Sequence, residues 1–457
     1  MSDHHKETSP PSSEITPPSS RKKNLKVLFG IGTGNAMEWF DWNIYALFAV
    51  FFAPQFFASG SPMSDLLRTF GVFAVGFVAR PFGGVLFGLI ADRRGRQFSM
   101  TVAVGLAAVG SLIIGLTPTH ETIGAWAAVV LVTCRMIQGL AHGGELPSAN
   151  TYISEMAPRE KRGLWASLIY FSGTIGIICG AVLAAVLSGI LTDAQMSSYG
   201  WRIPFVLGGV FGLFALYLRS RLQETEIFES SAKSQKSESQ QSKPSLWSQI
   251  REHRRLLVRV AAMTVGSTVN YYVWAVATPA YAISVHGVDP SGAMWAGAAA
   301  NVVFIIMLPV WGTVSDRIGR RPVLIFSGIM MITLLFPLTS IIRGQAWQLF
   351  VAMAIALVFM AGTVSIGPAV FSEMFPTRMR AVGIGLPTSL AVAIFGGTTP
   401  YLQAFFADKG IPGVFNWYAI VLMAISVATV IFFLPESKGK DLTAAGEVAE
   451  SLSPSSV

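Results

Sequence analysis

Charged side chains are scarce in this 457-residue chain. Asp, Glu, Lys and Arg make up 13% of the residues, whereas a soluble domain carries about 25%. Hydrophobic residues make up 52%, and the mean hydropathy is +0.55. A soluble fold of this size cannot hide so much apolar surface, because folded proteins already expose many apolar atoms. The composition therefore argues against a soluble enzyme.

Cysteine and histidine are also rare. The two cysteines, Cys134 and Cys179, both lie in apolar runs, and the six histidines show no ligand spacing. These patterns argue against a disulfide framework and against a metal centre. The sequence shows no Walker motif for nucleotide binding and no recognisable nucleophile–base set. We therefore expect no cofactor, no metal and no enzymatic activity, so that any uphill process must draw on a gradient.

Long apolar runs dominate the rest of the chain. Residues 1–26 are polar and read as a disordered tail, and no cleavable signal peptide is apparent. Twelve segments, each near the ~20 residues needed to cross a bilayer, then follow. They lie at about 27–54, 69–91, 98–117, 124–153, 164–190, 201–219, 257–285, 291–313, 322–342, 346–372, 381–407 and 414–434. Lipid offers the backbone no hydrogen-bond partners, so the sequence predicts an all-α polytopic membrane protein.

Lys and Arg are distributed unevenly between the two sides of the predicted spans. If the N-terminus lies inside, the outer loops receive only Arg68, Arg202, Arg343 and Lys409. Positive residues favour the cytoplasmic side, so both termini are expected there, in the cell (inner) membrane. The net charge of +8 comes from the Lys and Arg residues of the cytoplasmic loops, so we expect a lipid bilayer rather than a nucleic acid as the partner.

The chain is organised as two similar halves. Residues 220–256 are rich in Ser, Gln, Lys and Glu and form a predicted cytoplasmic linker between bundles at 27–219 and 257–434, with a tail at 435–457. The pattern G-x-x-x-D-R-x-G-R begins at Gly88 after the second span and again at Gly312 after the eighth. Matching motifs predict two pseudo-symmetric six-helix bundles, related by an axis along the membrane normal.

The repeated loop is a candidate cytoplasmic gate. Acids and bases retained in both copies can pair across the two halves and hold one side closed. The residues assigned to this gate are Asp92, Arg93, Arg96, Asp316, Arg317 and Arg320, with Glu145 towards the cytoplasmic end of the fourth span. The alternative is a rigid positive loop that only fixes topology.

The doubled motif, the twelve spans and the central polar loop together resemble the major facilitator superfamily. A narrower resemblance, to the metabolite:proton symporter family, is carried by several motifs. These are Gly34-Asn35 with Glu38-Trp39-Phe40-Asp41, Arg80-Pro81-Phe82-Gly83-Gly84, Arg135-Met136-Ile137-Gln138-Gly139 with Gly143-Gly144-Glu145, and Gly200-Trp201-Arg202-Ile203-Pro204-Phe205. The resemblance implies carriage of 2-oxoglutarate, citrate, shikimate, an aromatic acid, or proline or betaine. The overall run of motifs looks most like the 2-oxoglutarate permease branch.

Two carboxylates lie within the first span, where ionisable groups are costly and are candidates for function. Glu38 and Asp41 are three residues apart, so they lie on the same side of a helix, and Asn35 and Tyr45 extend that polar stripe. A low-dielectric cleft disfavours the ionised carboxyl and so allows it to carry a proton near neutral pH. We expect Glu38 or Asp41 to couple proton movement; the alternative is a structural pair.

Two arginines lie deep within spans. Arg80 and Arg135 cannot shed their charge, and guanidinium recognises carboxylates in bidentate fashion. We assign both to substrate binding, with Gln138 one turn after Arg135; permanent ion pairs that hold helices together are the alternative. Further substrate contacts are expected from Asn35, Tyr45, Asn270 and Tyr271.

The function expected from these features is proton-coupled uptake of a small organic acid by alternating access. The substrate is expected to be a di- or tricarboxylate such as 2-oxoglutarate, or a shikimate-like or aromatic carboxylate, and the chain is expected to act as a monomer. A carrier of a zwitterionic or neutral solute, such as proline, betaine or a sugar, is the alternative.

Overall fold

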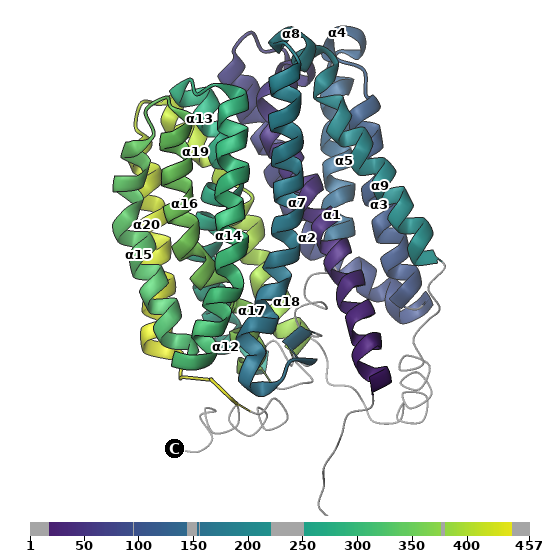
Figure 1. The fold of residues 1–457 in the computed structure, drawn as a ribbon. Coiled ribbons are helices and arrows are strands. Elements are labelled where there is room, and N and C mark those ends of the chain that lie inside the picture. The colour runs from purple at the N-terminus through teal and green to yellow at the C-terminus, as the bar shows by residue number, and fades with distance from the viewer. Residues whose placement is uncertain are drawn as a thin grey trace, which may run out of the picture.

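The computed structural model describes residues 18–94, 96–143, 153–154, 156–220, 251–375 and 380–440. Within these residues every regular element is a helix, and no strand occurs. Consecutive helices join into twelve long rods, six in each half of the described chain. Figure 1 shows the two halves side by side, with the N-terminal half in purple and blue and the C-terminal half in green and yellow.

The N-terminal half begins with the longest helix. Its elements are α1 (Pro18–Phe57), α2 (Pro62–Arg94), α3 (Arg96–Leu116), α4 (His120–Ile123), α5 (Trp126–His142), η1 (Arg159–Lys161), α7 (Arg162–Ile190), α8 (Asp193–Gln195), η2 (Met196–Gly200) and α9 (Arg202–Ser220). The short elements α4 and α8 lie at the top of Figure 1, called here the upper end; the lower end is the one at which α1 begins.

The C-terminal half repeats this plan with three interrupted rods. Its elements are α12 (Arg254–Tyr271), η3 (Tyr272–Ala277), α13 (Thr278–His286), α14 (Pro290–Ile318), α15 (Arg320–Ile341), α16 (Ala346–Val364), α17 (Gly367–Met374), α18 (Arg380–Ala391), η4 (Val392–Gly396), α19 (Thr399–Asp408) and α20 (Pro412–Phe433). Both η3 and η4 are π-helical turns, which insert an extra residue into a helix and are frequent at functional sites.

Glycines bring α2 and α5 into direct backbone contact. A Cβ atom at Gly139 would lie 1.9 Å from the carbonyl oxygen of Gly76, and one at Gly143 would lie 1.9 Å from that of Arg80. Small residues allow such close approach of helices where lipid supplies no hydrophobic drive for packing. The backbone of Arg80 is thereby held firmly against α5.

The two halves meet along α7 and α14. Near the lower end a Cβ at Gly163 would lie 2.7 Å from the Gly312 carbonyl oxygen. Nearer the upper end, the hydroxyl of Ser291 donates a hydrogen bond to the Ala185 carbonyl at 3.3 Å. The pair of helices in the middle of Figure 1 therefore joins the halves along its length.

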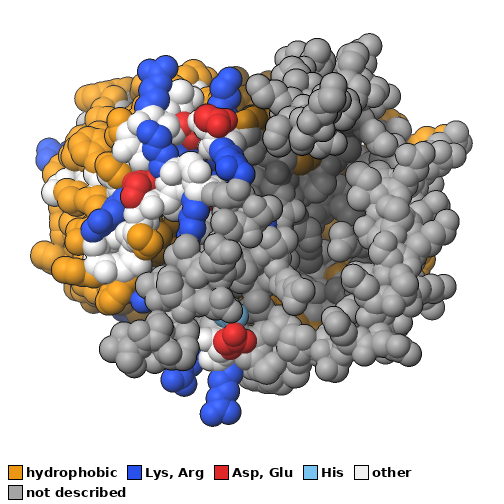
Figure 2. Space-filling view, turned by 90° about the horizontal axis from the view of Figure 1, so that it is seen from below, with side chains coloured by type: hydrophobic (Ala, Val, Ile, Leu, Met, Phe, Trp, Pro, Cys, Tyr) orange, Lys and Arg blue, Asp and Glu red, His pale blue; other side chains and the backbone are white. Residues whose placement is uncertain are grey.

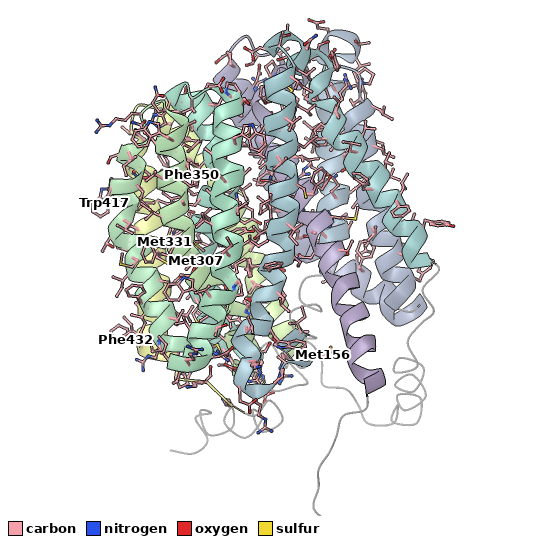
Figure 3. The ribbon with its side chains drawn as sticks, viewed as in Figure 1. Met156, Met307, Met331, Phe350, Trp417 and Phe432 are labelled. Carbon is pink, nitrogen blue, oxygen red and sulfur yellow. The ribbon has the colours of Figure 1, made fainter. Side chains whose placement is uncertain are left out.

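The outer surface of the bundle is apolar. Trp417 and Phe432 point away from the C-terminal half in Figure 3 and are 61% and 76% exposed. In Figure 2, which views the lower end, charged side chains of the C-terminal half gather on the end face and hydrophobic side chains surround them. Seven helical segments among the described residues are long and apolar enough to cross a membrane, and two shorter apolar helices accompany them. The predicted all-α polytopic fold of two six-helix bundles is confirmed.

Candidate functional site

A cavity lies between the two halves. The N-terminal half lines it with Trp39, Arg80, His142 and Tyr170, and the C-terminal half contributes tyrosines and a series of serine and threonine side chains. The cavity has a volume of about 120 Å³, which is enough room for a small solute. Its position at the interface of two pseudo-symmetric bundles is the one expected for a transported solute.

Arg80 places a positive charge on the cavity wall. Its guanidinium lies between the rings of Trp42 and Phe77, 4.4 Å from each ring centroid. The Nη2 atom lies 3.1 Å from the Glu38 carboxylate, while Nε has no hydrogen-bond acceptor among the described residues. The aromatic rings fix the plane of the guanidinium, and part of its hydrogen-bonding capacity has no acceptor among the described residues.

Glu38 lies between Arg80 and a histidine. Its carboxylate is 3.9 Å from Nδ1 of His142, at the end of α5, and its residue is 5% exposed. His142 lines the cavity. Glu38 is thus a buried carboxylate whose two neighbours both face the space where a solute would bind.

Asp41 belongs to a separate and more enclosed cluster. Its carboxylate lies 3.7 Å from Nη1 of Arg135, and it accepts hydrogen bonds from Ser111 and from the amide of Gln138. Arg135 is fully buried and also donates to the Gln138 side-chain oxygen at 2.9 Å. Neither Asp41 nor Arg135 lines the cavity. This arrangement satisfies a buried charge pair with further hydrogen bonds.

One indole separates the two ion pairs. The guanidinium of Arg135 lies 4.0 Å from the Trp42 ring centroid and 4.3 Å from that of Tyr45. Trp42 therefore contacts both arginines, Arg80 on the cavity side and Arg135 on the enclosed side.

The other predicted substrate contacts fall in different places. Tyr271 lines the cavity, and its buried hydroxyl has no hydrogen-bond partner in the described part of the chain. Asn35 donates to the Ile169 carbonyl and to Ser172 on α7, and Tyr45 donates to the Thr69 carbonyl. Asn270 donates to the Gly266 carbonyl of its own helix. In this structure these last three side chains connect helices or cap backbone groups, away from the cavity.

Aromatic residues connect the C-terminal half to α2 beside the cavity. Tyr272 in η3 packs edge-on against Phe77 of α2, with ring centroids 5.1 Å apart. Gly396 in η4 and the following Gly397 allow this approach, because a Cβ at either would lie within 3 Å of Tyr272 or Phe77. The two π-helical turns thus lie where the C-terminal half meets α2.

Asp316 from the repeated motif connects the halves at the lower end. Its carboxylate accepts the backbone N–H groups of Gly163 and Leu164, at 2.8 and 2.9 Å, in the first turn of α7. It also pairs with Arg320 at 2.7 Å. A carboxylate at a helix N-terminus satisfies otherwise unpaired donors and interacts favourably with the helix dipole.

Glu373 forms a second connection at the lower end that the sequence did not assign to the site. Its fully buried carboxylate lies 2.9 Å from Arg162 of the other half and 3.4 Å from Arg320, and it accepts the Ser437 hydroxyl at 2.6 Å. The sequence did carry a signal, because the tripeptide Ser-Glu-Met followed by an arginine occurs once in each half: Arg162 follows the first copy at 154–156, and Glu373 belongs to the second copy at 372–374.

The remaining predicted gate residues are placed only in part. Arg317 is exposed, and its carbonyl accepts a hydrogen bond from Lys438. The side chains of Asp92, Arg93 and Arg96, and the whole of Glu145, lie outside the described residues. Among the described residues no group of three or more His, Cys, Asp or Glu side chains is arranged to hold a metal ion.

Comparison with known proteins agrees with this architecture. A family described as "Sugar (and other) transporter" matches residues 27–228 and 220–449. The alpha-ketoglutarate permease of Escherichia coli K12 is 35% identical over 426 residues, which cover 93% of this chain and 96% of the permease. A putative proline/betaine transporter of Staphylococcus aureus is 32% identical, covering 92% of this chain and 90% of that protein.

Solved structures share the fold at lower identity. A D-xylose–proton symporter superposes with a TM-score of 0.70 at 19% identity, covering 92% of this chain and 100% of the symporter. The Escherichia coli xylose transporter in a partially occluded inward-open conformation gives the same TM-score and identity, over 92% and 99% of the chains. The resemblance read from the repeated motifs is therefore confirmed. The chain belongs to the sugar (and other) transporter family of the major facilitator superfamily and is a multi-pass membrane transporter.

Proposed function

We propose that this transporter carries a small organic acid together with protons, by alternating access to the cavity between its two halves. The observation that carries the proposal is the Arg80–Glu38 pair, in which a cavity-lining guanidinium lies 3.1 Å from a buried carboxylate. Such a pair brings an anion-binding group and a proton-binding group into direct contact.

The pair provides a simple route to coupling. While Glu38 is ionised, it competes with a substrate carboxylate for Arg80. Protonation of Glu38 removes that competition, so the substrate anion binds the guanidinium more tightly. Thermodynamic linkage then requires that bound substrate favours the protonated state of Glu38 by the same factor. His142, 3.9 Å from Glu38 and on the cavity wall, lies on the path by which the proton arrives.

Asp41 has a different role in this proposal. It neutralises Arg135 in a cluster that does not line the cavity, so it maintains the packing of α1, α3 and α5 rather than exchanging protons with the solute space. Of the two carboxylates expected to couple protons, Glu38 is the better placed.

The lower end is proposed to be cytoplasmic. Lys and Arg residues concentrate in the loops on the side of the N-terminus, which favours a cytoplasmic location for both termini in the cell membrane. Alternation then consists of separating the Asp316–Gly163 and Glu373–Arg162 contacts at that end while the aromatic contacts close the upper end, and the reverse. The cavity and its ion pairs lie within one chain, which supports action as a monomer.

An anionic substrate is favoured over a zwitterion by Arg80. The relatives carry both possibilities in their names, alpha-ketoglutarate in one and proline or betaine in the other. A guanidinium with free hydrogen-bonding capacity on the wall fits a carboxylate whose charge is not already balanced within the solute.

The test is proton movement in proteoliposomes containing a pH-sensitive dye. Addition of organic acids outside should move protons inward with the wild-type protein. Glu38→Gln should abolish this movement yet retain exchange of internal for external substrate, because a neutral side chain leaves Arg80 free for the anion. Glu121→Gln, which alters an exposed carboxylate at the upper end, is the matched control and should behave as wild type. Substrate-driven proton movement that survives Glu38→Gln would refute the assignment.

A further inference from the structure

We infer that the preferred substrate is a monocarboxylate whose uncharged part bears several hydroxyl groups, rather than an unsubstituted dicarboxylate. The inference rests on the transport function proposed above and names the substrate class of the same cavity. It follows from how the two halves divide the chemistry of the cavity wall.

The described cavity wall carries one permanent cation. Arg80, from the N-terminal half, is the only Lys or Arg among the described residues that line the space. The other basic side chain there, His142, lies beside the Glu38 carboxylate. Among the described lining residues, no guanidinium or ammonium would be left to pair with a second carboxylate of the substrate, and a charged group that loses its water without gaining a partner is costly.

The opposite wall combines hydroxyl groups with apolar side chains. Seven serine and threonine side chains line the cavity, and all of them belong to the C-terminal half. They are Thr264, Ser267, Thr268, Thr363, Thr388, Ser389 and Ser426. This wall carries no charged side chain among the described residues, and apolar side chains such as Met263, Phe371 and Val427 line it together with the hydroxyl groups.

Most of these hydroxyls already donate their single hydrogen to a backbone carbonyl. Thr264 donates its hydrogen to the Val260 carbonyl at 2.7 Å, Thr363 to that of Met360 at 2.9 Å, and Thr388 to that of Ile384 at 2.6 Å. Ser267 and Ser426 likewise donate to backbone carbonyls. A hydroxyl has one hydrogen and two lone pairs, so the capacity that remains toward the cavity is that of an acceptor.

Side chains that present lone pairs to the cavity favour a solute with hydrogen-bond donors. The hydroxyl groups of a substrate can each donate to it, whereas a second carboxylate would face acceptors with another acceptor. Tyr271, whose buried hydroxyl lacks a partner among the described residues, adds one group able to donate or accept beside Trp39. The cavity therefore combines one anion-binding point with a surface for O–H donors.

The experiment compares solutes that differ in these features in the proteoliposome proton-movement assay. D-gluconate and hexanoate share a six-carbon monocarboxylate chain and differ in hydroxyl groups; 2-oxoglutarate adds a second carboxylate, and betaine has no donor. We expect the apparent affinity for gluconate to exceed those for hexanoate and 2-oxoglutarate by at least about tenfold, as expected where a site is built to pair substrate hydroxyls.

Wall variants test the same point from the protein side. Thr363→Val and Thr388→Val keep the side-chain shape and remove the oxygen. Each should weaken gluconate by about fivefold, the effect of one ordinary hydrogen bond, while hexanoate is unchanged. Thr333→Val is the control, because Thr333 makes the same kind of bond to its own helix on the exposed face of α15.

The outcomes separate the two proposals. The signal of protein-free liposomes is subtracted first, because undissociated hexanoic acid crosses a bilayer unaided. If 2-oxoglutarate or hexanoate then moves protons as well as gluconate does, or if the valine variants weaken both six-carbon acids equally, the hydroxyl inference fails while acid transport stands. If no acid moves protons and only betaine or a neutral sugar is carried, the proposed function fails as well.

Discussion

Loss of the Asp41 carboxylate should destabilise the protein because it leaves a guanidinium buried without its counter-charge. Arg135 has no exposed surface, and its ionic partner is 3.7 Å away. Removing one member of a buried pair costs about 3–5 kcal/mol. The Gln138 oxygen and the faces of Trp42 and Tyr45 remain, and such cation–π contacts offset about 1–2 kcal/mol. We therefore expect Asp41→Asn to lower the free energy of unfolding by about 2–3 kcal/mol.

The assay is equilibrium unfolding in detergent micelles with a chemical denaturant, combined with a double-mutant cycle. Asp41→Asn together with Arg135→Met removes both charges and should recover more than half of the loss. Asp408→Asn is the control, because Asp408 is paired with Lys409 at 3.9 Å on the exposed surface and should change stability by less than about 0.5 kcal/mol. An Asp41→Asn effect as small as that of the control, or no recovery in the double variant, would refute the reasoning.

Two further variants probe the lower end. Gly163→Ala places a Cβ 2.6 Å from Arg320 Nη1 and 2.7 Å from the Gly312 carbonyl oxygen. Such overpacking costs about 1–3 kcal/mol and should favour molecules in which the lower ends of the two halves are separated. The measurement is the distance between spin labels on α7 and α14, which should become longer. Gly71→Ala, with no atom within 4 Å of the new Cβ, is its control, and equal distance distributions would contradict the expectation. Burial alone would raise the pKa of Glu436, but hydrogen bonds from the backbone N–H groups of Arg320, Arg321, Lys438 and Ser437 hold that pKa below its ordinary value. The ionised Glu436 therefore stabilises the folded protein at pH values above the ordinary carboxyl pKa. This stabilisation is lost as the pH falls through the lowered pKa. Glu436→Gln should therefore cost about 1 kcal/mol at neutral pH, and the stabilities of the two proteins in denaturant unfolding should converge as the pH falls through the lowered pKa; a pH-independent difference would exclude this role.

The twelve-rod fold could be predicted because a bilayer leaves the backbone few choices. Each apolar run must become a helix, and α2 and α14 both end within the repeated motif that begins at Gly88 and Gly312, a few residues beyond the predicted span ends at 91 and 313. The π-helical turns η3 and η4 carried no such signal in the sequence; η3 begins at Tyr272, which packs against Phe77 of a helix far away in sequence.

The candidate site was predictable in its members but not in its pairings. Glu38 and Asp41 are three residues apart, which separates their directions around a helix by about 60°. That angle is enough to turn one toward Arg80 and the other toward Arg135, and only the positions of α2 and α5 decide which. The hydroxyl wall was missed because single serines and threonines are ordinary in membrane helices. The spacing of Thr264, Ser267 and Thr268 on one helix face was nevertheless visible.

Trp42 links the cavity-lining Arg80 to Arg135, which lies in the enclosed cluster inside the N-terminal half. The same indole ring lies 4.4 Å from the guanidinium that faces the solute and 4.0 Å from the one sealed behind it. Because Glu38 and Trp42 belong to the same helix, a tilt of α1 that moves Glu38 also moves the Trp42 ring relative to Arg135. Substrate binding and helix movement are therefore coupled through Trp42. Solute preference is better redesigned on the cavity wall of the C-terminal half, since a substitution of Trp42 would disturb both the Arg80–Glu38 and the Arg135–Asp41 ion pairs.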